Sequence, residues 1–424
     1  MKYLLLVFIS FFIISCGSSS SDNLDSNNSP VNQNNIIDTN SRLLNQLNNI
    51  RINAGMIALT NNKYLNSSAY NHAFYLDTNN KVSHYESSND KNFTGVKPVD
   101  RTNAVGFKST MVSENLSVGQ ATEESSLKGL MSAIYHRFGF LDFSINTIGY
   151  GKENVSYVYN MGNSDLNHLC EGTSFNSSGS TYVGVCVDSS FKIEASVYEN
   201  KLNKTINANP SYVIYPYNNE KNVTTSFYEE TPDPLPSYDV SGYPISIEFN
   251  KNQYDMSKFS VNNFIIKNEN DVLLELAVDY KDGNSILSKP NDINNHISYY
   301  QFAIFPKNRL NFNTNYTVEF SYTYEGVSKN IIWGFKTEKL DNFIQYNNST
   351  LNLDRNTKYN IYIPPVNKND IYNRFSLSCS NNLIDIEFFD LNTLKISGYK
   401  TSSCTLSLSN TNQTNTKTIN ININ

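Results

Sequence analysis

The apolar pattern of the sequence changes near Tyr198, and this change constrains the fold more than any other feature. Before it, apolar residues recur at helical spacing, as in residues 43–50 and 65–76. After it, short apolar runs alternate with turn residues, which is the pattern of a β-sandwich. We therefore expect an α+β chain, in which a mixed N-terminal domain precedes an all-β part.

The first domain should contain further helices and strands. A helix is predicted from Ser125 to Tyr135, because Glu123 and Glu124 precede it and suit the positive end of a helix dipole. The stretches "NTIGYG" and "SYVYNMG" are short, aromatic and punctuated by glycine, so they predict strands.

A chain of 424 residues is too long for one core, since domains typically hold about 100–200 residues. Pro232, Pro234 and Pro236 stand at alternate positions and predict a semi-rigid connector. Trp333 lies within a strand-like run and should fill a sandwich core. The expected parts are a signal peptide (1–15), a flexible tether (16–40), a mixed domain (41–205), the connector (206–240) and two immunoglobulin-like sandwiches (241–338 and 340–424).

The N-terminus has the pattern of an export signal. One lysine precedes the apolar run Leu4–Ile14, which is shorter than the roughly 20 residues that span a bilayer but suits a signal peptide. The small residue before Cys16 resembles a bacterial lipobox, whose cysteine is acylated, although Ile13 stands where that motif usually has leucine. The alternative is an ordinary signal peptide cut nearby.

The residues after Cys16 are rich in Ser, Asn and Asp and have little to bury, so a flexible tether is expected. A covalent lipid on Cys16 would then attach the protein to a membrane. These features predict a lipid-anchored protein of the bacterial cell envelope, at the outer membrane or the cell surface.

Four cysteines remain besides Cys16, and four cysteines allow three connectivities. With the domain division above, only the pairs Cys170–Cys186 and Cys379–Cys404 stay within one domain. Two disulfides suit an oxidising compartment, while four reduced buried thiols are the alternative. There is no C-x-x-C spacing of the kind that holds zinc.

The charge pattern argues against nucleic acid as a partner. The chain has 33 Lys and Arg against 39 Asp and Glu, a net charge of −6, and no basic run. It also lacks H-E-x-x-H, G-x-S-x-G and phosphate-loop motifs, so no motif in the sequence supports a hydrolase or nucleotide-binding function.

Four of the five histidines lie within about one hundred residues. Three segments carry the chemistry: "VSHYES" with His84, "SENLSVG" with Glu114, and "SAIYHRFGFL" with His136. With "NNIRINAGMIALTNNKYL" before them and "TIGYG" after, the ordered series over residues 41–163 resembles the CAP superfamily in its bacterial extracellular SCP-like form. This superfamily comprises the cysteine-rich secretory, antigen 5 and pathogenesis-related proteins. The following connector and β-sandwich resemble those after CAP domains in some bacterial proteins.

The resemblance implies an α-β-α sandwich with a central cavity, where two histidines and acidic residues converge and often hold a divalent metal. His84 matches the first histidine, Glu114 the acid of the G-E-N motif, and His136 the second histidine. Ser113 replaces the usual glycine, and the second acid has no counterpart, because residues 129–135 contain no carboxylate. The set is thereby reduced to a triad.

Two interpretations of this triad stay open. Two imidazoles and a carboxylate make a partial shell for Zn²⁺ or another divalent metal, with water completing it. Alternatively, His84 and His136 only hydrogen-bond Glu114 and form a buried structural network. Glu86 is expected in solvent, His72 in the core or at its rim on an amphipathic helix, and His168 at the surface.

The expected function is binding, by a membrane-anchored CAP-domain lipoprotein, of a lipid, sterol-like, peptide or envelope-glycan ligand. A second interpretation is a metal-assisted, peptidase-like hydrolase using His84 and His136 with Glu114 as base. A third is a structural or adhesive surface protein with a vestigial cavity, which the repeated β modules favour.

Overall fold

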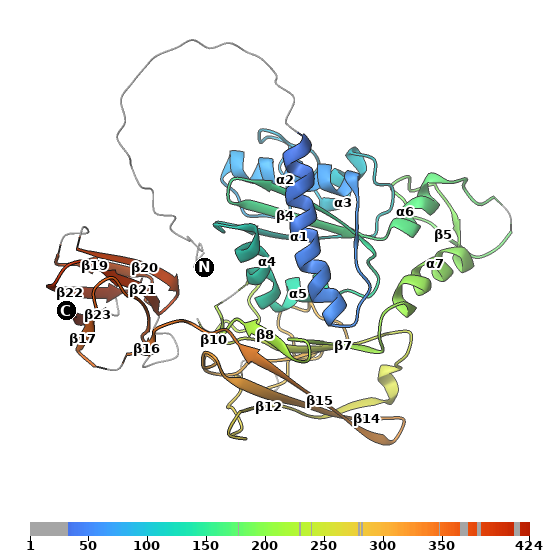
Figure 1. Ribbon diagram of the computed structural model, residues 1–424. Coiled ribbons are helices and arrows are strands. Elements are labelled where there is room, and N and C mark those ends of the chain that lie inside the picture. Colours follow the sequence, from blue (N-terminus) through green and yellow to red (C-terminus); the bar gives the residue numbers. More distant parts are fainter. Residues whose placement is uncertain are drawn as a thin grey trace, which may run out of the picture. The chain divides into compact units, whose positions relative to one another are not determined.

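The structure is a computed structural model (Figure 1) that describes residues 33–424, except 177, 229, 239, 279, 281–282, 347, 365–371, 380–382 and 411–415. The predicted signal peptide and Cys16 lie outside the described residues. The described chain divides into two compact units, the first formed by residues 33–131, 135–213 and 249–254, and the second by residues 132–134, 214–248 and 255–424.

The first unit is built on a four-stranded sheet. Its order is β1-β3-β4-β2, with bounds Thr60–Asn61, Thr147–Glu153, Ser156–Gly162 and Val112–Val118. Strand β1 runs parallel to β3, and the other pairs are antiparallel. Strands β3 and β4 form a hairpin whose turn holds Asn154 at φ 46°, a left-handed conformation that asparagine tolerates. The two strands predicted from "NTIGYG" and "SYVYNMG" are confirmed.

Helix α2 (Lys63–Asn79) lies directly on one face of this sheet. A Cβ on Gly149 would lie 2.0 Å from the carbonyl carbon of Leu65, and one on Gly151 would lie 2.0 Å from the backbone nitrogen of Tyr70. These two glycines of β3 therefore allow the backbones of helix and strand to touch.

Helices α1 (Gln33–Asn53) and α4 (Glu123–Ser132) cover the opposite face. Leu43 and Leu47 of α1 line the same small cavity as Tyr150 of β3. The Ser126 hydroxyl of α4 lies 2.8 Å from the hydroxyl of Tyr159. Because side chains alternate along a strand, this face is opposite to the one that carries the glycines. The three layers make an α-β-α sandwich, as predicted.

Two details of the first unit differ from the expectation. Helix α1 begins at Gln33, so the last part of the expected tether, residues 33–40, is helical. Helix α7 (Ala195–Asn207) continues past Tyr198, where the apolar pattern predicted the end of helical structure. The other elements are α3 (Pro98–Ala104), α5 (Ile134–Phe140), α6 (Ser164–Glu171), β5 (Thr181–Tyr182) and β6 (Ile193–Glu194). A disulfide joins Cys170 and Cys186.

The second unit begins with a β-sandwich. One sheet has the order β13-β11-β7 (Gln301–Ile304, Ile245–Phe249, Tyr212–Tyr215), and the other has the order β12-β14-β15-β8 (Phe259–Asn268, Asn315–Tyr324, Val327–Thr337, Glu220–Val223). Strands β9 (Ser226–Phe227) and β10 (Ser241–Gly242) pair separately, and a short 3₁₀ helix spans Met256–Lys258. Trp333 is buried in this sandwich, with 3% of its surface exposed.

Residues 206–240, which were expected to form a connector, have a different structure. Strands β7 and β8 of that segment join the two sheets of the sandwich, and β9 pairs with β10. The segment is largely part of the sandwich rather than a separate linker.

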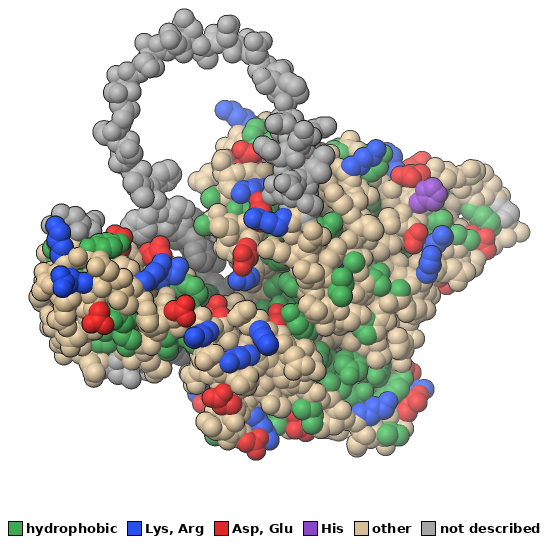
Figure 2. Space-filling view, viewed as in Figure 1, with side chains coloured by type: hydrophobic (Ala, Val, Ile, Leu, Met, Phe, Trp, Pro, Cys, Tyr) green, Lys and Arg blue, Asp and Glu red, His purple; other side chains and the backbone are tan. Residues whose placement is uncertain are grey.

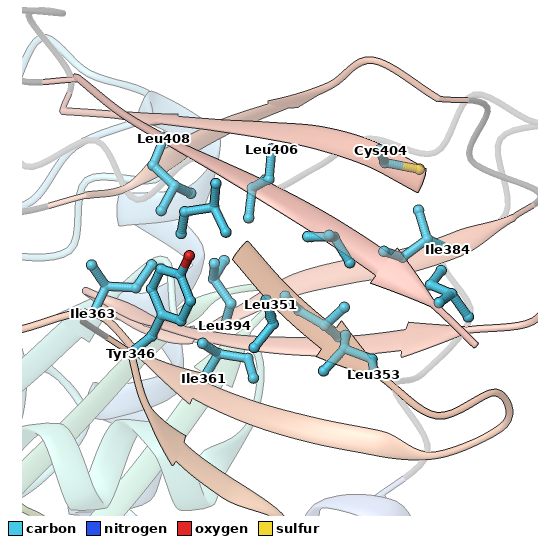
Figure 3. Packing of buried hydrophobic residues seen from close by; sticks show 14 of the residues in the cluster. Tyr346, Leu351, Leu353, Ile361, Ile363, Ile384, Leu394, Cys404, Leu406 and Leu408 are labelled. Atoms are coloured by element: carbon cyan, nitrogen blue, oxygen red, sulfur yellow. The ribbon is translucent and has the colours of Figure 1, made fainter. Parts of the chain in front are cut away.

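The last part of the chain is a second sandwich, which confirms the prediction of two β modules. Its sheets have the orders β16-β18-β21-β20 (Phe343–Gln345, Lys358–Tyr362, Thr393–Gly398, Ile384–Asp390) and β17-β23-β22-β19 (Thr350–Leu353, Thr416–Ile423, Ser402–Ser409, Arg374–Leu377). Figure 3 shows the buried side chains between them, among them Leu351, Leu394 and Leu406. Cys379 is bonded to Cys404, so both cysteine pairings are as predicted.

The face drawn in Figure 2 shows no single dominant charge. On the face drawn in Figure 2, basic and acidic side chains of the described residues are interspersed, which agrees with the absence of a basic run in the sequence. Within the part of the chain that the structure describes, no helix is both long and apolar enough to cross a membrane.

Candidate functional site

The site is built around Glu114, which β2 places beneath helix α2. Glu114 pairs in register with Asn160 of the neighbouring strand β4. Leu116, two residues further on the same face, packs against Ala69 and Ala73 of α2. The carboxylate is therefore in the interior, with 1% of its side chain exposed.

Arg101 is the main partner of Glu114. Its Nη2 donates to both carboxylate oxygens, at 2.9 and 2.7 Å, and the arginine side chain is fully buried. Helix α3 supplies this arginine. The helix begins at Pro98, and the side chain of Asp100 accepts a hydrogen bond from the backbone of Lys97, which stabilises the helix start.

His84 also contacts Glu114, but from the surface side. Its Nδ1 lies 3.0 Å from Oε1 of Glu114, and 39% of its side chain is exposed. An ionised carboxylate only accepts hydrogen bonds, so Nδ1 carries the proton. The other ring nitrogen, Nε2, has no partner among the described residues and is available to a ligand or to water.

Glu114 remains ionised in this environment. Burial alone raises the pKa of its carboxyl, but the hydrogen bond from His84 and the positive charge of Arg101 outweigh burial. The net effect is a pKa below the usual 4.5.

A second pair, His72 and Glu86, lies beside the first. His72 Nδ1 is 2.8 Å from Oε1 of Glu86, and its Nε2 is 2.9 Å from the carbonyl oxygen of Ser83. A carbonyl only accepts, so Nε2 must donate, and one proton is then shared between Nδ1 and the carboxyl. The pair is neutral overall wherever that proton resides. Both side chains are fully buried.

These positions test two expectations. His72 is in the core, as predicted, whereas Glu86 was expected in solvent and is buried. The reason is that Glu86 has several donors besides His72. The backbone N–H groups of Thr94 and Gly95 donate to its Oε2, at 2.6 and 3.3 Å. His168, expected at the surface, has 85% of its side chain exposed.

The two pairs form one network, which we call the His–Glu network and define as His72, His84, Glu86, Arg101 and Glu114. His72 Nε2 lies 3.7 Å from Oε1 of Glu114, and Arg101 Nε lies 3.7 Å from Oε1 of Glu86. Its groups form two compensated pairs, Arg101 with Glu114 and His72 with Glu86, together with His84. Compensation of this kind is what allows charges to be buried.

His136 lies beside strand β2. It lies on α5 and is partly buried, and its backbone carbonyl accepts a hydrogen bond of 2.8 Å from Nδ2 of Asn115. Among the described residues, no group of three or more His, Cys, Asp or Glu side chains is arranged to hold a metal ion. The structure therefore shows no metal triad of His84, Glu114 and His136 in the part of the chain that it describes.

The chemistry of the donors gives the reason. The guanidinium of Arg101 occupies both oxygens of Glu114, and its positive charge opposes a cation at that position. This donor set does not fit a divalent metal. The buried polar network, the other interpretation of the sequence, agrees with the geometry, although its members differ from those predicted.

Sequence reasoning missed Arg101, which is central to the network. Helix α3 is only seven residues long, too short for apolar periodicity to reveal. Proline at Pro98 with an acid two residues later, at Asp100, is a recognised signal of a helix start and could have drawn attention to the arginine that follows.

Comparison with known proteins agrees with this fold. Residues 44–171 match the family described as CAP: Cysteine-rich secretory protein family. This part of the chain is therefore a CAP domain of the cysteine-rich secretory protein family. No curated protein sequence matches the chain.

Several solved structures are similar. One is an extracellular protein containing a SCP domain from Bacillus anthracis str. Ames, with 18% identity, a TM-score of 0.28 and coverage of 32% of this chain and 45% of the other. A cysteine-rich secretory protein from Staphylococcus aureus subsp. aureus Mu50 has 16% identity, a TM-score of 0.25 and coverage of 34% and 43%. An outer surface protein from Borrelia burgdorferi has 16% identity, a TM-score of 0.25 and coverage of 29% and 90%. The match spans less than half of the Bacillus and Staphylococcus chains.

Proposed function

We propose that this protein is an exported CAP-domain lipoprotein of the bacterial cell envelope, anchored through a lipid on Cys16, which acts by binding a lipid or peptide ligand at the surface around His84. The observation that carries the proposal is the closure of the His–Glu network. The side chains of His72, Glu86, Arg101 and Glu114 are at most 1% exposed, and only His84 reaches the surface. Such an arrangement holds a fold rigid and presents one imidazole.

The surface around His84 is suited to an apolar ligand. Four large apolar side chains between residues 82 and 96 are 37–69% exposed, namely Val82, Tyr85, Phe93 and Val96. These four residues are close in the chain, and we propose that they form one apolar surface of the kind typical of interaction sites. A single polar group among them, here the free nitrogen of His84, would orient a ligand.

This surface rests on a rigid base. Nη1 of Arg101 donates to the carbonyl oxygens of His84 and Val96, at 3.1 and 3.4 Å, and the backbone N–H of Glu86 donates to Val96 at 3.0 Å. Residues 84–86 and Val96, near the two ends of this segment, are thus linked by hydrogen bonds. A preformed surface loses less conformational entropy when a ligand binds.

The hydrolase interpretation is less well supported by this geometry. A general base must be free to take a proton, but both oxygens of Glu114 accept hydrogen bonds from Arg101, and the pKa of Glu114 is lowered. The donor set does not fit the metal that such a hydrolase would need. We therefore favour binding over turnover.

The test is a binding experiment with the full chain carrying Cys16→Ser, so that the lipid does not itself insert into membranes. The probes are vesicles of phosphatidylglycerol and phosphatidylethanolamine, and an uncharged peptide rich in leucine and phenylalanine. We expect one of them to protect residues 81–96 from hydrogen exchange, and His84→Ala and Tyr85→Ala to weaken binding several-fold.

The matched control is His168→Ala, which removes an exposed histidine of the same unit and should leave binding unchanged. Absence of binding to both probes, or equal loss in His84→Ala and His168→Ala, would contradict the proposal. It would then favour a structural or adhesive role for the chain.

A further inference from the structure

The first β-sandwich of the second unit carries a polar cleft of its own. A cleft of about 130 Å³, open to solvent, lies beside the end of β12, the start of β14 and the segment that follows β13. Six of the residues that line it have polar side chains: Asn268, Glu275, Asn308, Arg309, Asn311 and Tyr316. This volume is smaller than that of a typical small-molecule pocket, so only part of a ligand would enter the cleft.

The two charged side chains in the cleft are already neutralised. Glu275 forms an ion pair with Lys307. Arg309 forms an ion pair with Asp390, and its Nε donates to the hydroxyl of Thr225 at 2.7 Å. Because each charge has its partner, the cleft offers little net attraction to an anion or a cation.

The neutral polar groups, in contrast, are free. The side-chain amides of Asn308 and Asn311 have no hydrogen-bond partner among the described residues. Asn268 uses its Oδ1 to accept from the backbone of Asn270 and Val272, at 3.0 and 3.1 Å, and its Nδ2 has no such partner. Tyr316 is buried and accepts from the backbone N–H of Asn311 at 2.8 Å, so its own O–H proton remains available.

A set of neutral donors and acceptors without net charge selects a particular ligand chemistry. Each amide both donates and accepts, as does each hydroxyl of a sugar, so one hydroxyl can pair with two protein groups. Leu274 and Pro306 add apolar surface against which the C–H groups of a sugar ring can pack. We infer that this cleft is a binding site for a neutral saccharide, separate from the surface around His84.

The experiment measures binding of N,N′,N″-triacetylchitotriose and maltotriose to the full chain by calorimetry and by chemical-shift changes of asparagine side-chain amides. We expect at least one of them to bind at millimolar concentration or below. The double variant Asn308→Ala/Asn311→Ala should lose about tenfold in affinity, because each lost hydrogen bond weakens binding roughly threefold to tenfold.

The matched control is Asn263→Ala, which removes an exposed asparagine of β12 that does not line the cleft and should keep the wild-type affinity. A sulfated oligosaccharide of the same length should bind more weakly than the neutral ones. The inference is overturned if neither neutral sugar binds at millimolar concentration, if the double variant binds like wild type, or if the sulfated sugar binds best.

Discussion

Arg101 and Glu114 form an ion pair in the interior of the CAP domain, with both side chains at most 1% exposed. A buried pair gains little stability relative to two apolar residues, because both charges have lost their hydration. Breaking it is a different matter. The remaining charge would have neither water nor a partner. Removing either residue should therefore destabilise the folded domain.

Removing Arg101 should therefore destabilise the first unit strongly. Arg101→Ala leaves Glu114 without its cation and removes the charge beside Glu86, and we expect a loss of about 3–5 kcal/mol in the free energy of unfolding. Hydrogen exchange of peptides from residues 44–171 reports this unit separately from the β modules. Lys128→Ala, which breaks an exposed pair with Glu124, should cost at most about 0.5 kcal/mol. Equal effects of the two variants would contradict a buried network.

The stability of the same unit should depend on pH through Glu114. Its pKa in the folded state lies below the ordinary value of 4.5, because the His84 hydrogen bond and the Arg101 charge outweigh burial. The unfolded chain then binds more protons between the two values, so stability falls as pH drops below about 4.5 and this contribution is gone once the pH is under the folded pKa.

The measurement is the free energy of unfolding of the first unit against pH. Glu114→Gln should be less stable than wild type at neutral pH and should show a flatter dependence on pH below 4.5. Glu325→Gln, an exposed residue of the other unit, is the control and should leave the slope of the first unit unchanged. An unchanged slope in Glu114→Gln would show that other carboxyls control the acid response.

Gly151→Ala should disrupt the packing of helix α2 on strand β3. The added methyl would lie 2.0 Å from a backbone nitrogen of Tyr70, which is too close for any side-chain rearrangement to relieve. We expect a loss of more than about 3 kcal/mol or failure of the first unit to fold. Gly129→Ala is the matched control, since only the side-chain amide of Gln120, at 3.9 Å, lies near its new methyl. In helix α4 that change should stabilise by about 0.5–1 kcal/mol. The measurement is the melting temperature of wild type, Gly151→Ala and Gly129→Ala. A Gly151→Ala protein that melts like wild type would contradict the close packing of α2 on β3.

The sequence predicted those parts of the fold that depend on local pattern. Helix α2 and strands β3 and β4 follow from apolar spacing and glycine placement. The two disulfides follow from the domain division, because other pairings would join separate domains. Each of these features is decided by residues that are close together in the chain.

The site depends on longer-range contacts, and here prediction was partial. His84 and Glu114 were correctly brought together, since the order of the motifs carries that information. Arg101, which also pairs with Glu114, was not predicted, because a seven-residue helix delivers it and periodicity does not detect so short an element. Glu86 was misplaced in solvent, since the donors of Thr94 and Gly95 that surround it come from a loop without a regular pattern.

Cys16→Ser should release the protein from the membrane. The apolar run before this cysteine is too short to span a bilayer, so the acyl chains would be the anchor. We expect the variant to move from the membrane fraction to the soluble fraction, and to lose incorporation of labelled palmitate. Ser10→Thr, a conservative change in the apolar run that keeps Ser15 and Cys16, is a control for damage to the export signal. A variant that stays in the membrane fraction after export would show that another anchor exists.

Arg309 should hold the two sandwiches of the second unit in a fixed arrangement. Its guanidinium pairs with Asp390 of the last sandwich, and its Nη1 donates to the hydroxyl of Thr393 at 3.0 Å. The rings of Phe312 and Tyr362, one from each sandwich, lie 4.7 and 4.8 Å from its central carbon. With 4% of its side chain exposed, this cation is largely desolvated, which strengthens both the ion pair and the ring contacts.

Arg309→Ala should therefore cost about 3–5 kcal/mol, because Asp390 keeps its charge at a position where only 15% of its side chain is exposed. The same change should loosen the junction, and X-ray scattering should show a broader distribution of interatomic distances. Arg309→Lys keeps the charge but lacks the planar guanidinium that pairs with both carboxylate oxygens and packs on the aromatic rings, so its effect should be intermediate. Lys258→Ala, which breaks an exposed pair with Glu325, is the control and should change neither stability nor scattering. If Arg309→Ala melts and scatters like wild type, the contact is not what holds the two sandwiches together.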